Sequence, residues 1–231
     1  MTKYRPHAAG STRGGRHDYL PAAGHDALLP AYDPLARLLG MNRVHENLIG
    51  HAELTDGQRI LEIGCGTGNL IIHAKRLHPA AEFVGSDPDP RALSRARRKA
   101  HGMAGIRFER GYAQQLPYAD GEFDRVLSSM MLHHLDNHVK ADAAAEIFRV
   151  LRPGGRLHLV DLGGDVTAQD GLAARLLMHN RHAASNLGDE IPRLLRTAGF
   201  DCTTAATERH RFLGRLTYHC AIRPIQSPDR Q

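Results

Sequence analysis

The sequence predicts an α/β protein built on a doubly wound, mostly parallel sheet of seven strands. Two observations predict it. Apolar, strand-like runs alternate with amphipathic, helix-like runs along the chain, and a glycine-rich turn joins the first strand to the helix after it. The 231 residues, 42% of them hydrophobic, are enough for one domain with a sizeable core. We expect a single domain over residues 21–223, between a disordered basic tail at 1–20 and a short tail at 224–231.

The central alternation predicts five parallel strands. They are RILEIG (59–64), EFVGSD (82–87), IRFERG (106–111), FDRVLSSM (123–130) and, after the turn signal RPGG, GRLHLVDL (155–162). Helices are expected between them at 69–78, 89–101 and 137–151. Towards the end, a helix at 189–200 closed by Gly199 precedes two runs, 201–209 and 213–223. These two runs predict an antiparallel C-terminal hairpin around Gly214, which completes the seven strands.

Two segments fall outside this alternation. Residues 27–54 carry helical apolar spacing before the first strand, and residues 165–188 lie between the fifth strand and the last helix. Open α/β sheets bind ligands at the carboxyl ends of their strands, so elements added there shape a pocket. We expect both segments to cap this edge. The second is interpreted as a mobile substrate lid or, alternatively, as a fixed helix that completes the core.

Composition argues against several classes of protein. No run of about 18 apolar residues occurs, and the charged N-terminus lacks the apolar stretch of a signal peptide, so we expect a cytoplasmic protein with no membrane span. The three cysteines are far apart and lack metal-site or disulfide spacing. The net charge of +5 gathers in the N-terminal tail and in a run where Arg91, Arg95 and Arg98 share a helix face. We interpret that face as solvated, which argues against nucleic acid as a partner.

The turn LEIGCGTG, after the first strand, is the strongest functional signal. Gly64, Gly66 and Gly68 permit positive φ and let the main chain approach a ligand closely. The helix that follows offers free N–H groups at its start. A dinucleotide fingerprint would need glycine where the chain has Asn69, and no Lys followed by Ser or Thr completes a P-loop. Neither phosphate-binding motif is therefore present.

The turn and three later motifs resemble, in order, those of class I S-adenosylmethionine-dependent methyltransferases, among them the type 11 enzymes of ubiquinone and menaquinone biosynthesis. The later motifs are FVGSDPDP, GYAQQLPYADGEFDRVLSSMMLHHL and RVLRPGGRLHLVD. The resemblance covers roughly residues 54–161. It implies a Rossmann-like methyltransferase fold, S-adenosyl-L-methionine as cofactor and methyl transfer by in-line displacement. It also implies that the glycine turn, including Cys65, lies against the methionine part of the cofactor.

The resemblance assigns three further side chains to the cofactor. Asp87, which follows Gly64 by 23 residues, is placed to accept both ribose hydroxyls, with helix capping as the structural alternative. Pro88 would pack against the adenine or begin a turn. Glu62, a carboxylate within an apolar strand, would support the glycine turn and the ammonium of the cofactor, or serve the structure alone.

The adenine end departs from the family pattern. Many relatives have Gly-Asp-Ala where this chain has Gly111-Tyr112-Ala113, and that Asp accepts the adenine amino group. Tyr112 could accept one hydrogen bond, stack on the purine or pack in the core, while the Ala113 N–H stays available to a ring nitrogen. Tyr32 resembles a tyrosine that covers the cofactor in quinone-type enzymes, or it packs in the core. Ser129, where the fourth strand ends, completes the expected cofactor contacts.

The sequence LHHL follows the fourth strand and contains the candidate catalytic residues. His133 or His134 could act as a general base if the acceptor must lose a proton, or both could be structural. His134 and His138 have the i, i+4 spacing of a helical metal site. Because we expect a loop between Ser129 and Asn137, we predict no metal there.

Missing motifs narrow the acceptor. SSMM (128–131) stands where amino-directed DNA and glutamine methyltransferases carry Asn or Asp, Pro, Pro and an aromatic residue, and the chain has neither a Pro-Cys dipeptide nor a cysteine cluster. We therefore expect a small-molecule methyl acceptor, aromatic or lipid-like, beside Met130 and Met131. An RNA-modifying enzyme and a non-catalytic cofactor-binding protein stay open as alternatives, and the chain could form a homodimer.

Overall fold

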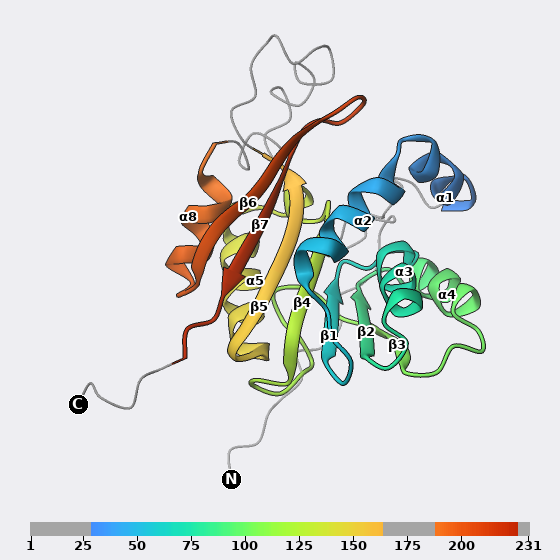
Figure 1. The fold of residues 1–231 in the computed structure, drawn as a ribbon, viewed down its shortest axis with the longest axis horizontal. Coiled ribbons are helices and arrows are strands. Elements are labelled where there is room, and N and C mark those ends of the chain that lie inside the picture. The colour runs from blue at the N-terminus through green and yellow to red at the C-terminus, as the bar shows by residue number, and fades with distance from the viewer. Residues whose placement is uncertain (1–28, 164–187, 226–231) are drawn as a thin grey trace, which may run out of the picture.

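The computed structural model describes residues 29–163 and 188–225, which form one twisted sheet with helices on both faces (Figure 1). The sheet has seven strands in the order β3-β2-β1-β4-β5-β7-β6. Strands β1 to β5 pair in parallel, whereas β7 runs antiparallel to both β5 and β6. The predicted doubly wound fold with an antiparallel C-terminal hairpin is confirmed.

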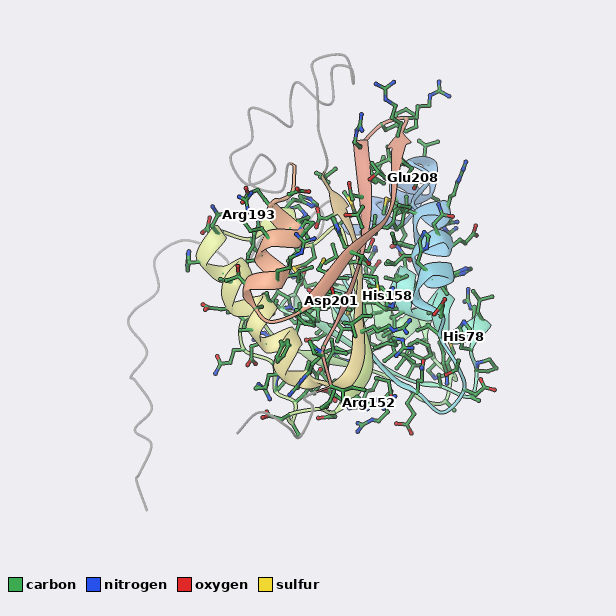
Figure 2. The ribbon with its side chains drawn as sticks, turned by 60° about the vertical axis from the view of Figure 1, so that its left-hand side comes forward. His78, Arg152, His158, Arg193, Asp201 and Glu208 are labelled. Carbon is green, nitrogen blue, oxygen red and sulfur yellow. The ribbon has the colours of Figure 1, made fainter. Side chains whose placement is uncertain are left out.

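The strands follow the apolar runs of the sequence. Their bounds are β1 Arg59–Ile63, β2 Glu82–Asp87, β3 Ile106–Arg110, β4 Phe123–Ser129, β5 Leu151–Leu162, β6 Asp201–His210 and β7 Gly214–Ile222. Central β1 is buried along almost its whole length, because helices cover both its faces, whereas most residues of edge strand β6 are half-buried or exposed. Figure 2 brings this edge into view, with Asp201 and Glu208 marking the two ends of β6.

Among the described residues, five helices flank the sheet. Helices α2 Met41–Ala52, α3 Asn69–Leu77 and α4 Pro90–Lys99 bury one apolar cluster, while α5 Asn137–Val150 and α8 Glu190–Thr197 bury a second cluster on the opposite face (Figure 1). The start of α4 follows the sequence signals: Asp89 Oδ1 accepts a hydrogen bond from the Arg91 N–H at 2.8 Å, and proline occupies the first helical position. Asp89, and not Asp87, is thus the cap of this helix.

The start of β5 differs from the prediction. The turn signal RPGG places the strand start at residue 155, but the strand begins at Leu151. Leu151 pairs with Phe123, the register then shifts, and pairing resumes between Arg156 and Arg125. RPGG therefore forms an irregularity within the strand, and Gly154 accommodates it with a φ of 77°.

Two helices precede β1, as the pattern in residues 27–54 predicts: α1 Leu29–Leu38 and α2. The proposed lid at 165–188 lies outside the described residues except for Gly188, as do the tail at 1–20 and most of the tail at 224–231. Tyr32 falls within α1, but its side chain is outside the described part. Within the described ranges, no helix has the length and apolarity needed to cross a bilayer.

Candidate cofactor and acceptor site

A cavity of about 470 Å³ lies at the carboxyl ends of β1, β2 and β4. Helices α1 and α2 contribute to its wall through Ala36, Met41 and His45. This is the edge at which doubly wound sheets bind ligands, and the volume falls in the range of drug-sized ligand sites. Residues of the N-terminal segment therefore lie at this edge of the sheet.

The glycine turn forms one wall of the cavity. Gly64, Gly66 and Gly68 have φ values of 69°, 51° and 77°. Gly64 and Gly66 line the cavity, but Gly68 does not. A Cβ atom at Gly68 would lie 3.0 Å from both the Ala96 Cβ and the Phe108 ring. The absence of a side chain at Gly68 thus lets the turn pack against α4 and β3, and its expected contact with the cofactor stays a prediction.

The turn also packs against the segment that follows β4. A Cβ atom at Gly64 would lie 2.5 Å from the Met131 Cγ, so the two segments are in close contact. Cys65 lines the cavity between the two glycines, and burial raises the pKa of its thiol well above the usual range. The thiol is therefore neutral, and it contributes an apolar surface rather than a nucleophile.

Asp87 ends β2 and faces the cavity with 7% of its surface exposed. Its Oδ2 accepts a hydrogen bond from the Gly66 N–H at 2.8 Å, and its Oδ1 accepts one from the Asp89 N–H at 2.9 Å. Burial raises the pKa of Asp87 to about 6, although these two hydrogen bonds oppose the shift. The carboxylate is thus fixed in orientation, and each oxygen keeps lone pairs for a ligand.

Glu62 lies on β1 beneath the turn and is 3% exposed. Its Oε2 accepts a hydrogen bond from the Ile71 N–H, in the first turn of α3, at 3.0 Å. Burial raises the pKa of Glu62 well above its usual range, and the nearby charge of Asp87 adds to the effect. Glu62 therefore supports the turn and also lines the cavity, where a cation would favour its ionised form.

The far end of the cavity is formed by Pro88, Tyr112 and Ala113. Arg110 holds the first two: its Nη2 donates to the Tyr112 Oη at 3.2 Å, and its Nε donates to the Pro88 carbonyl at 3.2 Å. The guanidinium also lies over the Tyr112 ring at 5.9 Å from the centroid. Tyr112 belongs to neither apolar cluster of the core, so its ring is held at the cavity wall.

Ser129 closes β4 and supplies a polar group that the described residues leave without a partner. Its Oγ is buried against the cavity and has no hydrogen bond within the described part of the chain. A buried hydroxyl left unpaired costs free energy that a polar ligand would recover. Together with the two carboxyls and the close main-chain approach, this hydroxyl fits a nucleoside that carries an amino acid.

The two candidate histidines occupy different positions in the short 3-10 helix η2, Leu132–His134. His134 lines the cavity and is exposed to it. His133 does not line it; its Nδ1 lies 2.7 Å from the Oδ1 of Asp161. The two rings are in contact, tilted relative to each other, with centroids 3.9 Å apart. In the described ranges, no group of three or more His, Cys, Asp or Glu side chains is arranged to hold a metal.

Asp161 is a residue that the motifs did not single out. It is 1% exposed, and its carboxylate accepts hydrogen bonds from the N–H groups of Leu132 at 2.8 Å and Leu162 at 2.7 Å. Burial alone would raise the pKa of Asp161, but the charge and hydrogen bond of His133 outweigh it and hold this pKa below the usual range. Its position near the end of an apolar strand is a sequence signal that could have found it.

A second unexpected group ties α1 to the glycine turn. Asp33 accepts hydrogen bonds from Thr67 Oγ1 at 2.6 Å, Asn69 Nδ2 at 2.9 Å and Lys99 Nζ at 3.0 Å. Because the Lys99 ammonium also donates to Asn69 Oδ1, four side chains from three segments share one network. The network fixes the cap over the turn, immediately after the position of Tyr32.

His45 adds a neutral imidazole to the cavity wall. It lies on α2, is 9% exposed, and burial lowers its pKa to about 4 with help from the charges of His73 and Lys99. No local motif marks His45, because only the packing of α2 over the sheet brings it to the cavity. Its neutral ring can offer one donor and one acceptor to a ligand.

Comparisons with known proteins agree with this geometry. A family described as a methyltransferase domain matches residues 60–155. The chain is similar to a demethylmenaquinone methyltransferase of Deinococcus radiodurans, with 34% identity over 166 residues, or 70% of this chain and 67% of that protein. It is also similar to a demethylmenaquinone methyltransferase of Thermus thermophilus, with 35% identity, covering 64% and 69% respectively.

A solved structure extends the likeness to the fold. Phosphoethanolamine N-methyltransferase 2 of Haemonchus contortus, in complex with S-adenosylhomocysteine and phosphomonomethylethanolamine, superposes with a TM-score of 0.66 at 17% identity, over 79% of this chain and 52% of that one. The two relatives above share more than 30% identity over two thirds of their own length. We conclude that the chain belongs to the class I S-adenosylmethionine-dependent methyltransferases and that its cofactor is S-adenosyl-L-methionine.

Proposed function

We propose that this methyltransferase acts on a small-molecule acceptor of aromatic or lipid-like character. The observation that carries the proposal is the apolar part of the cavity wall, formed by Met41, Met130, Met131, Leu135 and Val139. Thioether side chains adapt to planar and to extended apolar groups. The names of the two bacterial relatives, both demethylmenaquinone methyltransferases, support an acceptor of the quinone type.

In this proposal the polar wall holds the cofactor, whose sulfonium supplies an electrophilic methyl group. Asp87 accepts the ribose hydroxyls, because its two oxygens are already oriented by main-chain N–H groups. Glu62 takes the ammonium, since a cation favours the ionised form of this buried carboxyl. The main chain of Gly64 to Gly66 lies along the amino acid part, and the Ser129 hydroxyl provides a further polar contact.

The adenine would lie between Pro88 and Tyr112. The Arg110 guanidinium fixes the Tyr112 ring, which can stack on the purine, and the Ala113 N–H can donate to a ring nitrogen. Tyr32 would cover the cofactor from α1, whose position over the turn is fixed by Asp33. Tyr112 thereby replaces, by stacking, the carboxylate that many relatives use at this position.

The residues of this chain contribute mainly alignment and exclusion of water. Holding the acceptor in line with the methyl group avoids the loss of translational and rotational entropy that a bimolecular step requires, which can supply several kcal/mol. In this proposal His134, which lines the cavity, takes a proton from the acceptor. His133 is held away from the cavity by Asp161.

The RNA alternative rests on the basic run of α4. Two of its basic residues serve the structure: Arg97 Nη2 donates to the Phe108 carbonyl at 2.6 Å, and Lys99 joins the Asp33 network. A transfer assay distinguishes a small-molecule acceptor from RNA. It measures methyl transfer from labelled cofactor to quinols, phenols, fatty acids and RNA, each at low and at high salt. We expect transfer to an apolar acceptor with little salt dependence. Transfer to RNA that falls steeply with salt would overturn the proposal, as would cofactor binding without transfer to any acceptor.

A further inference from the structure

The turn that carries His134 into the cavity is held in a strained conformation. Met130 follows β4 with a φ of 55°, in the left-handed region that is unfavourable for a non-glycine residue. Strand β5 holds the turn at two points. The Met130 N–H donates to the Val160 carbonyl at 2.9 Å, and the Leu132 N–H donates to Asp161 Oδ2 at 2.8 Å. Such strain persists only where neighbouring structure enforces it.

Asp161 is the centre of this arrangement. Its carboxylate accepts hydrogen bonds from three groups: the Leu132 N–H, the Leu162 N–H and the Nδ1 of His133. With 1% exposure and a pKa below the usual range, the group is an ionised carboxylate in a dry environment. An ionised carboxylate only accepts, so the Nδ1 of His133 must carry the proton. Asp161 therefore fixes both the ring position and the tautomer of His133.

His133 in turn contacts His134, the histidine that lines the cavity. Its ring packs against that of His134 in a tilted arrangement, with a centroid distance of 3.9 Å and an angle of 47° between the planes. The charge of Asp161 also interacts with His134, and this interaction helps to lower the pKa of Asp161. Because the interaction is mutual, a positive charge on His134 is stabilised by the buried negative charge. That charge arises when His134 accepts a proton.

We propose, on the basis of the methyl transfer proposed above, that Asp161 and His133 are positioning residues for His134, the catalytic base. In this step the acceptor gives its proton to a ring nitrogen of His134, and the electron pair left on the acceptor forms the bond to the methyl carbon. The bond between that carbon and sulfur breaks, and its electron pair stays on sulfur. Asp161 stabilises the resulting imidazolium and keeps the strained turn in place.

Other charged groups surround the array and must be kept constant in a test. Lys140 of α5 and His219 of β7 interact electrostatically with Asp161, and Asp136 lines the cavity beside His134. A variant that changes only Asp161 leaves these groups in place. Differences in the titration of His134 between variant and wild type then report the missing negative charge.

The experiment combines ring-nitrogen NMR with kinetics on the full chain. In the wild type we expect His133 to show the tautomer protonated on Nδ1. In Asp161→Asn we expect the titration midpoint of His134 to move to lower pH, because an opposite charge is lost. The acid limb of the kcat profile should follow it, and kcat should fall at least about tenfold with little change in KM. Affinity for S-adenosylhomocysteine should stay within about twofold.

Asp124→Asn is the matched control, because Asp124 lies at the other end of β4, where it accepts a hydrogen bond from the Arg59 N–H at 2.8 Å. It should leave the His134 titration unchanged. An unchanged His134 midpoint in Asp161→Asn would overturn the inference, as would a wild-type His133 protonated on Nε2 alone. The tautomer of His133 is measured in the wild type. It therefore tests the inference even if Asp161→Asn does not fold. Failure of the wild type to bind S-adenosylhomocysteine would instead count against the proposed function.

Discussion

The two ends of the sheet use polar side chains in opposite ways. At the carboxyl end, three buried carboxyls, Glu62, Asp87 and Asp161, accept hydrogen bonds from main-chain N–H groups and adjoin the cavity or the turn beside it. At the amino end, two arginines, Arg149 and Arg223, donate to main-chain carbonyls. The comparison separates groups with acceptor capacity left for a ligand from groups that join elements of the fold.

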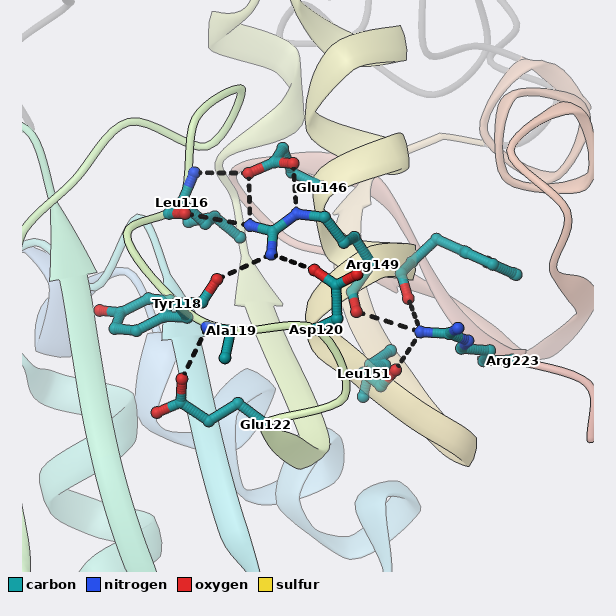
Figure 3. Close-up of polar contacts among 10 residues, drawn as sticks. Leu116, Tyr118, Ala119, Asp120, Glu122, Glu146, Arg149, Leu151 and Arg223 are labelled. Atoms are coloured by element: carbon teal, nitrogen blue, oxygen red, sulfur yellow. Dashed lines mark hydrogen bonds and ion pairs between the residues drawn. The ribbon is translucent and has the colours of Figure 1, made fainter. Parts of the chain in front are cut away.

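Figure 3 shows the amino end in detail. Arg149, at the end of α5, donates to the carbonyls of Tyr118 at 2.7 Å and Leu116 at 3.1 Å, and it forms ion pairs with Asp120 and Glu146. Arg149 thus fastens the loop between β3 and β4 to α5. The same loop begins at Tyr112, which lines the cavity and accepts a hydrogen bond from Arg110.

Arg223, just after β7, joins three further carbonyls. Its Nη1 donates to Phe148, Arg149 and Leu151 at 2.9, 3.0 and 2.7 Å (Figure 3). These carbonyls lie at the end of α5, where helices leave acceptors unsatisfied and favour a positive charge. The C-terminal hairpin is thereby attached to the helix, and neither Arg149 nor Arg223 lines the cavity at the carboxyl end.

The largest expected effect is on cofactor affinity. Asp87→Ala removes both ribose contacts, and the loss of two hydrogen bonds to a charged group costs roughly 3 kcal/mol or more, or at least about a hundredfold in Kd. Calorimetry with S-adenosylhomocysteine measures it, and circular dichroism checks the fold. Asp120→Ala at the amino end is the control, with unchanged affinity. A folded Asp87→Ala protein that binds as tightly as the wild type would show that the ribose lies elsewhere.

A substitution at the amino end of the sheet should affect the stability of the protein and not its affinity for the cofactor. Arg149→Ala breaks several hydrogen bonds to main-chain and carboxylate oxygens, and we expect it to lower the free energy of unfolding by about 2 kcal/mol. Chemical denaturation measures the loss, and S-adenosylhomocysteine affinity should stay within about twofold. Arg149→Lys should recover part of the stability. A large loss of affinity with normal stability would contradict the division between the two ends.

Local signals were enough to predict the fold and most of the polar wall. The strands follow apolar runs, Asp89 caps α4, and Asp87, which the family resemblance singled out, ends β2 and lines the cavity. These features depend on neighbouring residues in the chain. The exception is the early start of β5, which depends on how Leu151 pairs with Phe123 across the sheet.

The rest of the site depends on contacts between distant segments. Asp33 and Lys99 are 66 residues apart, and no periodicity indicates that they meet. The different positions of adjacent His133 and His134 follow from the hydrogen bond to Asp161, 28 residues further along the chain. A sequence pattern identifies such residues as candidates, but only the tertiary packing decides which of them reaches the cavity.

The pH dependence of S-adenosylhomocysteine binding is a further test of the role proposed for Asp87. Its pKa of about 6 is raised by burial, so the carboxyl gains a proton as pH falls through 6 and can no longer accept both ribose hydroxyls. We expect affinity for S-adenosylhomocysteine to be constant well above pH 6 and to fall by up to about tenfold per unit below it. Asp87→Asn should bind more weakly and show no such fall. An equal fall in both proteins would assign the dependence to another group.

The smallest effect concerns a buried histidine that does not line the cavity described above. His158 lies on β5 (Figure 2), is 2% exposed, and has an Nδ1 without a hydrogen bond within the described residues. Burial lowers its pKa to about 3, and the charges of Arg125 and Arg156 add to the shift. Between pH 6.5 and 3 the unfolded chain therefore binds more protons at this site than the folded protein does, and stability falls as pH falls.

His158→Leu tests this contribution. At pH 7 both proteins have the residue uncharged, so their free energies of unfolding should be similar. By pH 5 the wild type should have lost about 1 kcal/mol or more relative to the variant, since one pH unit corresponds to about 1.4 kcal/mol for one proton. His45 and His219 shift in the same direction but are present in both proteins, so their effect cancels in the comparison. Denaturation curves at pH 7 and pH 5 that differ by the same amount would show that His158 does not contribute to acid sensitivity.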